Sequence, residues 1–265
     1  MEITINDFKK ASIFVNIFNY VKYFTDKITI NIKQDQFYIQ GMDNSHVCIF
    51  ELKLQQSWFC QYNVNEPLEL GINVNILTKI LHTRDDNQNI ILSQDNDEAD
   101  SLTISLTTIS NSDNDKQYNK IFALPLMELE CELFEIPETE YSLTCFFESK
   151  KLKQIVDELS NFSDCVNITH DENDLLSMTA NSEYEGTMKI DIHNIDKEIV
   201  EGEGEIKMDL STKYLQYICN FQKLTENVNV YISDRTPLCI HYPFDETNYI
   251  RFYLAPKIND YEDDL

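Results

Sequence analysis

The feature that most constrains the fold of this chain is an internal duplication on either side of residues 126–140, which read LMELECELFEIPETE. Shifting the sequence by 138 positions superposes apolar residues of the first half on apolar residues of the second half without a gap. The superposed pairs include Ile3 and Tyr141, Phe14 and Leu152, Ile17 and Ile155, Val21 and Leu159, Phe37 and Leu175, Leu70 and Met208, Ile90 and Val228, and Leu102 and Ile240. Near the end of each copy, a shift of 131 positions places QYNKIFALP (117–125) on NYIRFYLAP (248–256). The sequence therefore predicts two copies of one domain joined by an acidic connector.

The duplication sets the predicted domain boundaries. We expect a first domain at 1–125, the connector at 126–140, a second domain at 141–257 and an acidic tail at 258–265. Two domains are also what a length of 265 residues favours, and a hydrophobic content of 42% allows each domain to bury its own core.

Each copy shows the same order of periodic patterns. Apolar residues recur at helical spacing in 13–24 and again in 152–162. Shorter helices are predicted at 74–82 and 212–220, with Asn73 and Ser211 as their caps. Segments such as KITINI and HVCIFELKL alternate or run apolar with β-branched and aromatic residues, as strands do. The predicted fold class is α+β, with antiparallel sheets and two helices on one face of each domain.

Charge is distributed unevenly along the chain. The net charge of −25 argues against binding to nucleic acid, because phosphates repel an acidic surface. However, the predicted helical segments 9–27, 73–84, 150–161 and 213–223 contain eleven lysine or arginine residues and three acidic ones, a net charge of +8 that leaves −33 for the rest. The residues expected to attract phosphate are Lys9, Lys10, Lys22, Lys79, Arg84, Lys150, Lys151, Lys153, Lys213 and Lys223. The alternative is that these helices contain lysine because it is a good helix former.

The cysteine content and the lengths of the apolar runs indicate in which cellular compartment the protein is expected. The seven cysteines are odd in number and scattered, which favours reduced core thiols in an intracellular protein over a disulfide framework or a zinc site. The chain has no apolar run of 18 residues and no signal-like N-terminus, so we expect a soluble protein that is not exported and does not contact a membrane.

No residues converge on a catalytic site. Five glycines allow neither a phosphate-cradling loop nor a dinucleotide fingerprint, and the chain lacks a nucleophile elbow and an HExxH pair. His46 and His241 fall in strand-like patterns and are predicted to be structural. The acidic run DNDEAD (95–100) lacks the glycine and the glutamate of a calcium loop, so a solvated turn is the better interpretation. We therefore expect no enzyme activity, no metal and no cofactor.

Four stretches resemble the signature sequences of the proliferating cell nuclear antigen family of eukaryotic DNA sliding clamps. They are GMDNSHVCIFEL (41–52), LGINVNILTKIL (70–81), ELFEIPETEYS (132–142) and YLAPKIND (253–260). The resemblance runs colinearly over essentially the whole chain. It implies the DNA clamp fold, with sheets outside and helices on the inner face of a head-to-tail homotrimeric ring. It also implies a processivity factor in DNA replication and DNA repair.

The resemblance assigns partners and site residues. The implied partners are double-stranded DNA held without sequence preference, a clamp loader, further copies of the chain, and DNA polymerase and other clients that carry short aromatic-containing peptides. The edge strand near 116–122 would pair with the strand near 185–191 of the next subunit, with Tyr118, Ile121, Met188 and Ile190 at the interface. The client-peptide pocket would comprise Met42, His46, Ile49, Phe134, Ile136, Pro137, Pro237, Tyr253, Ala255, Pro256 and Lys257.

The chain departs from the family pattern at several positions. Acidic Asp157 stands where a basic residue is usual, Glu172 replaces the loop lysine that takes ubiquitin in cellular relatives, and Phe134 is bulkier than the usual leucine. The alternatives are a subunit of a heterotrimeric checkpoint-type clamp, a monomeric processivity factor or, from another class, an acidic metal-dependent nuclease. The expected location is the nucleus, or the cytoplasmic replication site of a large DNA virus.

Overall fold

The structure is a computed structural model that describes residues 1–94, 100–108, 118–129, 133–137, 139–200, 205–234 and 236–257. The chain forms two compact units. The first comprises Met1–Asn44, Glu51–Glu135 and Phe244–Tyr249, and the second comprises Ser45–Phe50, Ile136–Pro243 and Ile250–Leu265. The division falls inside the predicted connector, between Glu135 and Ile136. The predicted acidic tail, most of the DNDEAD turn, Lys116 and Cys131 lie outside the described residues.

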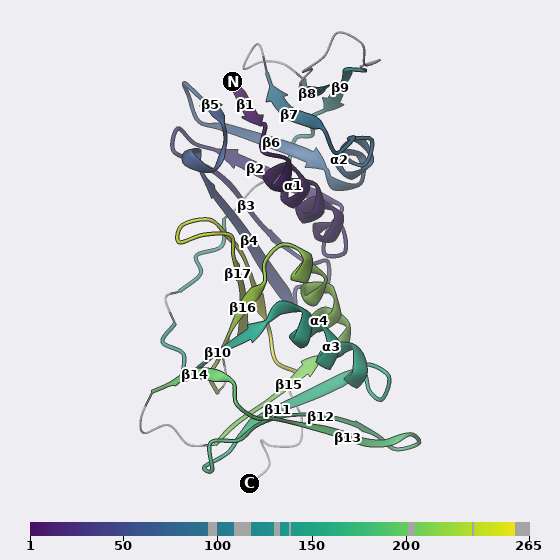
Figure 1. The fold of residues 1–265 in the computed structure, drawn as a ribbon, viewed down its shortest axis with the longest axis vertical. Helices are drawn as coiled ribbons and strands as arrows, with labels where there is room; N and C mark the ends of the chain where they lie inside the picture. Colours follow the sequence, from purple (N-terminus) through teal and green to yellow (C-terminus); the bar gives the residue numbers. More distant parts are fainter. Residues whose placement is uncertain are drawn as a thin grey trace. The chain divides into compact units, whose positions relative to one another are not determined.

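The first unit contains two antiparallel sheets and two α-helices (Figure 1). One sheet has the strand order β5-β1-β7-β8-β9, and the other has the order β4-β3-β2-β6 within this unit. The elements are β1 (Glu2–Ile5), α1 (Phe8–Val21), β2 (Lys27–Ile32), β3 (Gln36–Met42), β4 (Cys48–Gln55), η1 (Gln56–Trp58), β5 (Gln61–Asn63), β6 (Leu68–Asn73), α2 (Val74–Leu81), β7 (Gln88–Ser93), β8 (Ser101–Thr108) and β9 (Lys120–Pro125). The first three residues of β4 fall in the second unit by the division above.

The second unit repeats this topology strand for strand. Its sheets have the orders β14-β10-β16-β17-β18 and β13-β12-β11-β15. The elements are β10 (Leu143–Glu148), α3 (Ser149–Leu159), β11 (Cys165–His170), β12 (Leu176–Ser182), β13 (Gly186–Ile192), β14 (Asp196–Ile199), β15 (Ile206–Ser211), α4 (Thr212–Cys219), η2 (Asn220–Lys223), β16 (Asn227–Ile232), β17 (Leu238–Pro243) and β18 (Tyr249–Leu254). The predicted duplication and the α+β fold class are confirmed.

Strand registers correct the gapless superposition of the two copies. The central pairs β2–β6 and β11–β15 keep the shift of 138 residues. The registers of the neighbouring strands give three different equivalences. Ile3 corresponds to Cys145 and not to Tyr141, and Phe37 corresponds to Leu176 and not to Leu175. Ile240 corresponds to Ile104 and not to Leu102. Insertions and deletions fall in turns and before a helix, because core packing does not fix the chain length there.

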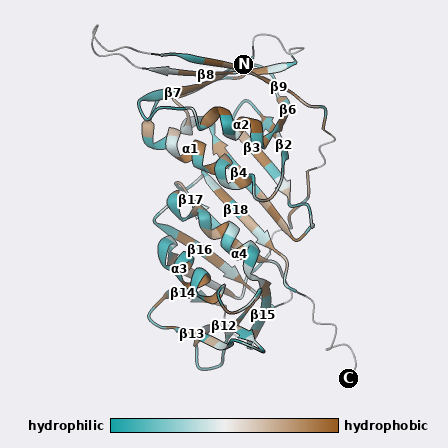
Figure 2. Ribbon diagram, turned by 90° about the vertical axis from the view of Figure 1, so that its right-hand side faces the viewer, coloured by the Kyte–Doolittle hydropathy of each residue, from teal (hydrophilic) through white to brown (hydrophobic). Residues whose placement is uncertain are grey.

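Helix faces follow the predicted periodicity. In α1, Phe14, Ile17 and Phe18 are buried, and the hydrophobic and hydrophilic residues alternate along the helix ribbons in Figure 2. Asn73 caps α2 as predicted, since its Oδ1 accepts from the N–H of Ile76 at 3.1 Å. Ser211 precedes α4 but its side chain makes no capping bond. Buried side chains therefore fix where each helix lies, and capping is secondary.

The prediction for the cysteines is only partly correct. Cys48, Cys145, Cys219 and Cys239 are buried, whereas Cys165 is half-buried and Cys60 is exposed after η1. None of the six described cysteines forms a disulfide. Burial raises the pKa of the Cys145 and Cys219 thiols to about 12, so both stay protonated at neutral pH. In the part of the chain that the structure describes, no helix is long and apolar enough to cross a bilayer.

Candidate functional site

The helices of the first unit display lysines on the side opposite their buried face. α1 and α2 lie side by side (Figures 1 and 2), and Thr78 Oγ1 donates a hydrogen bond to the carbonyl of Phe18 at 3.2 Å where they meet. Of the residues predicted to attract phosphate, Lys9 and Lys79 are exposed and Lys22 is half-exposed. The surface of this helix pair is therefore basic.

Two other predicted DNA-binding residues of this unit have structural partners. Lys10 Nζ donates to the carbonyl of Trp58 at 2.7 Å and lies 5.4 Å from the centroid of the indole ring. Arg84 Nε donates to the carbonyl of Gln88 at 2.7 Å, and its Nη2 donates to the carbonyl of Asp86 at 2.9 Å. Burial lowers the pKa of Arg84, although Asp86 and Asp85 oppose the shift. Both side chains hold loops in place, which limits their reach towards a ligand.

The second unit presents the equivalent basic helices. Gln216 Nε2 on α4 donates to Ser160 Oγ at the end of α3 at 2.9 Å. The predicted residues Lys150, Lys151, Lys213 and Lys223 are exposed. Lys153 differs, because its ammonium contacts both carboxylate oxygens of Asp157 at 2.5 Å. An open hollow of about 470 Å³ over α3 contains these two side chains.

Tyrosines beside the lysines are a feature that the sequence analysis missed. Lys22 Nζ lies 5.6 Å from the ring centroid of Tyr23, and Lys213 Nζ lies 6.0 Å and 5.7 Å from those of Tyr214 and Tyr217. Rings at this distance attract an ammonium group and restrict its motion. The signal was present in YVKYF (20–24) and TKYLQY (212–217), where a single lysine is followed directly by a tyrosine and a second aromatic residue comes one or three positions later.

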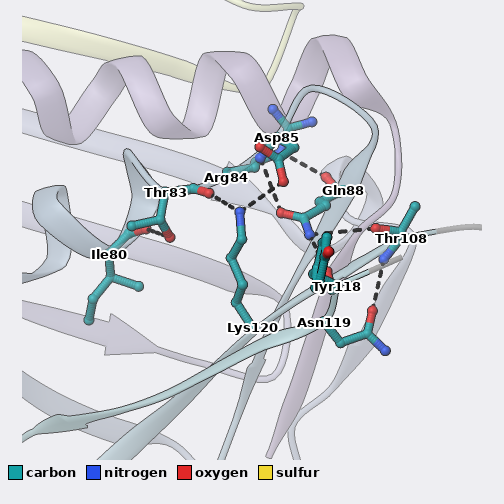
Figure 3. Close-up of polar contacts among 9 residues, drawn as sticks. All are labelled: Ile80, Thr83, Arg84, Asp85, Gln88, Thr108, Tyr118, Asn119 and Lys120. Atoms are coloured by element: carbon teal, nitrogen blue, oxygen red, sulfur yellow. Dashed lines mark hydrogen bonds and ion pairs between the residues drawn. The ribbon is translucent and has the colours of Figure 1, made fainter. Parts of the chain in front are cut away.

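The start of β9 is fixed by polar contacts with the loop between α2 and β7 (Figure 3). Lys120 Nζ contacts Asp85 Oδ2 at 2.8 Å and also donates to the carbonyl of Thr83. Buried Gln88 donates from Nε2 to the carbonyl of Tyr118 at 2.7 Å. These contacts fix the start of β9 to the loop between α2 and β7 and to Gln88.

Two predicted interface strands lie at the ends of their sheets. β9 ends the five-stranded sheet of the first unit, and β13 ends the four-stranded sheet of the second. Tyr118 and Ile121 are 69% and 72% exposed, which is unusual for large apolar side chains. Met188 and Ile190 alternate with exposed residues along β13 and are half-buried. Each strand thus offers an apolar side row and a line of backbone groups.

The connector is attached to the first unit at defined points. The Met127 N–H donates to the carbonyl of Gly71 at 2.8 Å. Further along, the backbone N–H of Phe134 donates to Gln40 Oε1 at 2.6 Å, and Gln40 Nε2 donates back to the carbonyl of Phe134 at 3.0 Å. Phe134 as a whole residue remains 41% exposed. Gln40 gave no functional signal in the sequence.

The residues predicted for the client-peptide pocket are divided between the two units in sequence. Met42 and Phe134 belong to the first unit and the other nine to the second. Within the second unit, the Ala255 N–H donates to the carbonyl of Val47 at 2.9 Å, which brings the YLAP segment next to the chain between His46 and Ile49. The Lys257 N–H donates to the carbonyl of Asp209 at 2.7 Å, and Tyr141 Oη donates to the carbonyl of Pro237 at 3.5 Å.

The histidines differ in their surroundings. His241 lies in β17 as predicted, and its Nδ1 accepts from Arg251 Nε at 3.1 Å. Burial, together with the nearby Arg251, lowers the pKa of His241 to about 4, so the ring is neutral at pH 7. The prediction that His46 lies in a strand was wrong, because it is exposed in the turn between β3 and β4 with φ 58°. No group of three or more metal-ligating side chains occurs among the residues that the structure covers.

Comparison with known proteins agrees with the geometry of both units. The family model for the N-terminal domain of proliferating cell nuclear antigen matches residues 4–133, and the model for its C-terminal domain matches residues 135–257. The chain is 29% identical over 259 residues to proliferating cell nuclear antigen of Chaetomium thermophilum, covering 96% of this chain and 98% of the relative. It is 26% identical over 230 residues to that of Caenorhabditis elegans, covering 84% and 85%. The chain therefore belongs to the proliferating cell nuclear antigen family, and its duplicated α+β architecture is the DNA clamp fold of that family.

Proposed function

We propose that three copies of this chain form a closed ring that encircles duplex DNA and tethers replication proteins to it. Family membership supports the role of a sliding clamp and processivity factor, which acts as a scaffold and not as an enzyme. The observation that carries the proposal is the lysine-bearing helix pair, which occurs once in each unit on an otherwise acidic chain.

The ring is proposed to close through strand pairing between β9 of one copy and β13 of the next. Such a contact is heterologous, so it closes into a ring only if the rotation between copies is correct. Tyr118 and Ile121 would be covered by Met188 and Ile190 of the neighbouring copy. Support comes from the exposure of the apolar side chains on β9 and from the polar contacts that hold its start.

The proposed DNA contact is electrostatic and independent of base sequence. Lysines on helix surfaces neutralise phosphates but do not reach base edges, so each contact is weak and the protein can slide. The six exposed residues Lys9, Lys79, Lys150, Lys151, Lys213 and Lys223 are the strongest candidates. Retention on DNA would come from the closed ring, because weak contacts alone dissociate readily.

Client proteins are proposed to bind through short aromatic-containing peptides at the connector and the YLAP segment. Buried aromatic and aliphatic anchors dominate the affinity of such small interfaces. A tethered polymerase gains processivity because its effective concentration at the DNA rises. A clamp loader would open the ring. Nuclear localisation is typical of eukaryotic members of the family, and the viral cytoplasmic alternative stays a prediction.

The mass in solution tests the ring directly. Light scattering at micromolar concentration is expected to give three times the chain mass of 31.1 kDa. A mass of one chain would contradict the homotrimer and favour a monomeric factor or a subunit of a mixed ring. Cleavage of labelled DNA with magnesium or manganese would instead favour a nuclease.

Topological retention needs a second experiment. The protein is loaded by a clamp loader onto a nicked circular plasmid, which is then cut once. We expect the protein to remain on the circle and to leave the linear DNA through its ends. Retention on linear DNA with open ends would contradict encirclement. As a control, blocking both ends with bound protein should restore retention on the linear DNA.

A further inference from the structure

Two described parts of the connector, 126–129 and 133–135, are bonded to the sheet β4-β3-β2-β6 of the first unit. Strand registers place Gly71 on β6 opposite Thr29 on β2, and Thr29 opposite Gln40 on β3. Met127 is bonded at the Gly71 end of this row, and Phe134 at the Gln40 end. The connector is therefore attached at both ends of a row that spans three strands.

The Gln40 side chain makes the two backbone hydrogen bonds to the connector that a neighbouring strand would otherwise make. A carboxamide carries one acceptor and a pair of donor hydrogens, so it can bond the N–H and the carbonyl of one residue at the same time. Gln40 does this with Phe134, at 2.6 Å and 3.0 Å. Only one orientation of the amide satisfies both bonds, which fixes its assignment. Since Gln40 is 8% exposed, the two bonds are shielded from competing water.

Sheet geometry explains why a side chain is used. β3 lies between β2 and β4, so the backbone groups of β3 are taken by the neighbouring strands. At β3 the connector can therefore bond only to side chains, whereas at the end strand β6 it bonds the backbone carbonyl of Gly71. β3 has two carboxamide side chains, Gln36 and Gln40, each long enough and carrying both a donor and an acceptor. Gln40 is the one that lies in the row with Thr29 and Gly71.

We propose that Gln40 is a positioning residue that fixes the backbone of Phe134 and so presents its ring to client peptides. This inference rests on the proposed client-binding function. Phe134 is 41% exposed as a residue, so with its backbone held its ring forms a preformed part of the binding surface for an aromatic-aliphatic peptide. Binding then orders less of the connector, and a smaller ordering cost gives a higher affinity.

The test compares Gln40→Leu with Gln40→Glu and with the control Gln36→Leu in the full chain. Gln36 lies on the same strand, is half-exposed and contributes its backbone carbonyl to a turn. Two quantities are measured: hydrogen exchange at the Phe134 amide, and the Kd of a labelled synthetic peptide carrying one leucine and two phenylalanines. Q40L is expected to accelerate exchange and raise the Kd by about 10-fold, since loss of two hydrogen bonds is of that order.

The other variants sharpen the result. Q40E keeps an acceptor for the Phe134 N–H but loses the donor, so exchange should stay slow while the Kd rises less than in Q40L. Q36L should change neither quantity. Because Gln40 is argued to act through Phe134, Q40L should have little further effect on the Kd in a Phe134→Ala background.

Three outcomes would overturn the inference in distinguishable ways. Faster exchange with an unchanged Kd would show that Gln40 holds the connector without serving binding. An equal Q40L effect with and without the Phe134 ring would show that Gln40 acts elsewhere. Failure of the unmodified chain to bind the peptide, with normal protection of the Phe134 amide, would reject the client-binding function itself.

Discussion

Lys153 Nζ lies 2.5 Å from both carboxylate oxygens of Asp157, one turn further along α3. The side chains are 23% and 44% exposed, so the pair is partly shielded from solvent. Lys153 is one of the residues predicted to attract phosphate, and the resemblance to the family predicts a basic residue where this chain has Asp157. The pair thus neutralises a lysine on the proposed DNA-facing surface.

Replacing Asp157 with Asn should strengthen DNA binding. The change releases Lys153, and each additional phosphate it contacts should steepen the dependence of log K on log salt by about 0.9. The measurement is fluorescence anisotropy with duplex DNA over a series of salt concentrations. Glu158→Gln is the matched control, because it removes the same charge from α3 while Glu158 bonds Gln154 and not a lysine. Equal gains in the two variants would show that net charge, and not release of Lys153, is responsible.

Replacing Ile121 with Asp should dissociate the proposed ring. A carboxylate on β9 would be desolvated against the neighbouring copy without a partner, and a buried unpaired charge costs several kcal/mol. Light scattering should give the mass of one chain, 31.1 kDa, with an unchanged circular dichroism spectrum. Ile199→Asp, on the edge strand β14 where the side chain is 46% exposed, is expected to leave the assembly intact. An intact assembly of the Ile121 variant would exclude β9 as the contact.

His241 should make the chain less stable as the pH falls. Its folded-state pKa of about 4 lies below the ordinary value of 6.5, so the unfolded chain takes up the proton first. The contribution of neutral His241 to the free energy of unfolding is therefore fully present above pH 6.5 and is lost as the pH falls from about 6.5 to 4. The loss amounts to about 1 to 3 kcal/mol. Urea unfolding near pH 7.5 and near pH 5 measures the loss, which should shrink in His241→Gln. Exposed His82, replaced in the same way, is the control, and an equal change in both variants would contradict the assignment.

Replacing Gly71 with Ala should displace the connector. A Cβ at this position would lie 2.1 Å from the Met127 carbonyl oxygen and 3.0 Å from Leu129 Cγ. Overpacking of this kind typically costs 1–3 kcal/mol, roughly, in the free energy of unfolding. Hydrogen exchange should accelerate at the Met127 amide, whose bond to Gly71 would be stretched. Adding Leu129→Ala should not restore protection, because the closest contact is with the backbone; full rescue would contradict this explanation.

Periodicity in the sequence was sufficient to locate the helices and the duplication. Buried positions such as Phe14 and Leu152 recur with the helical period, and this local pattern survives whatever the chain packs against. The strand equivalences near Ile3 and Phe37 were less accurate, because apolar alternation has a period of two and tolerates shifts that only the pairing partner resolves.

The sequence by itself determined the two-copy architecture, the four helices and the family, since these depend on local patterns and on colinear motifs. Tertiary structure decided which charged and polar side chains are committed to partners. Lys10 finds Trp58 48 residues away, and Gln40 finds Phe134 94 residues away. Such contacts depend on strand register and on the points at which the connector is bonded to the sheet. Register and attachment points are set when the whole core packs, so they cannot be predicted from short segments of the sequence.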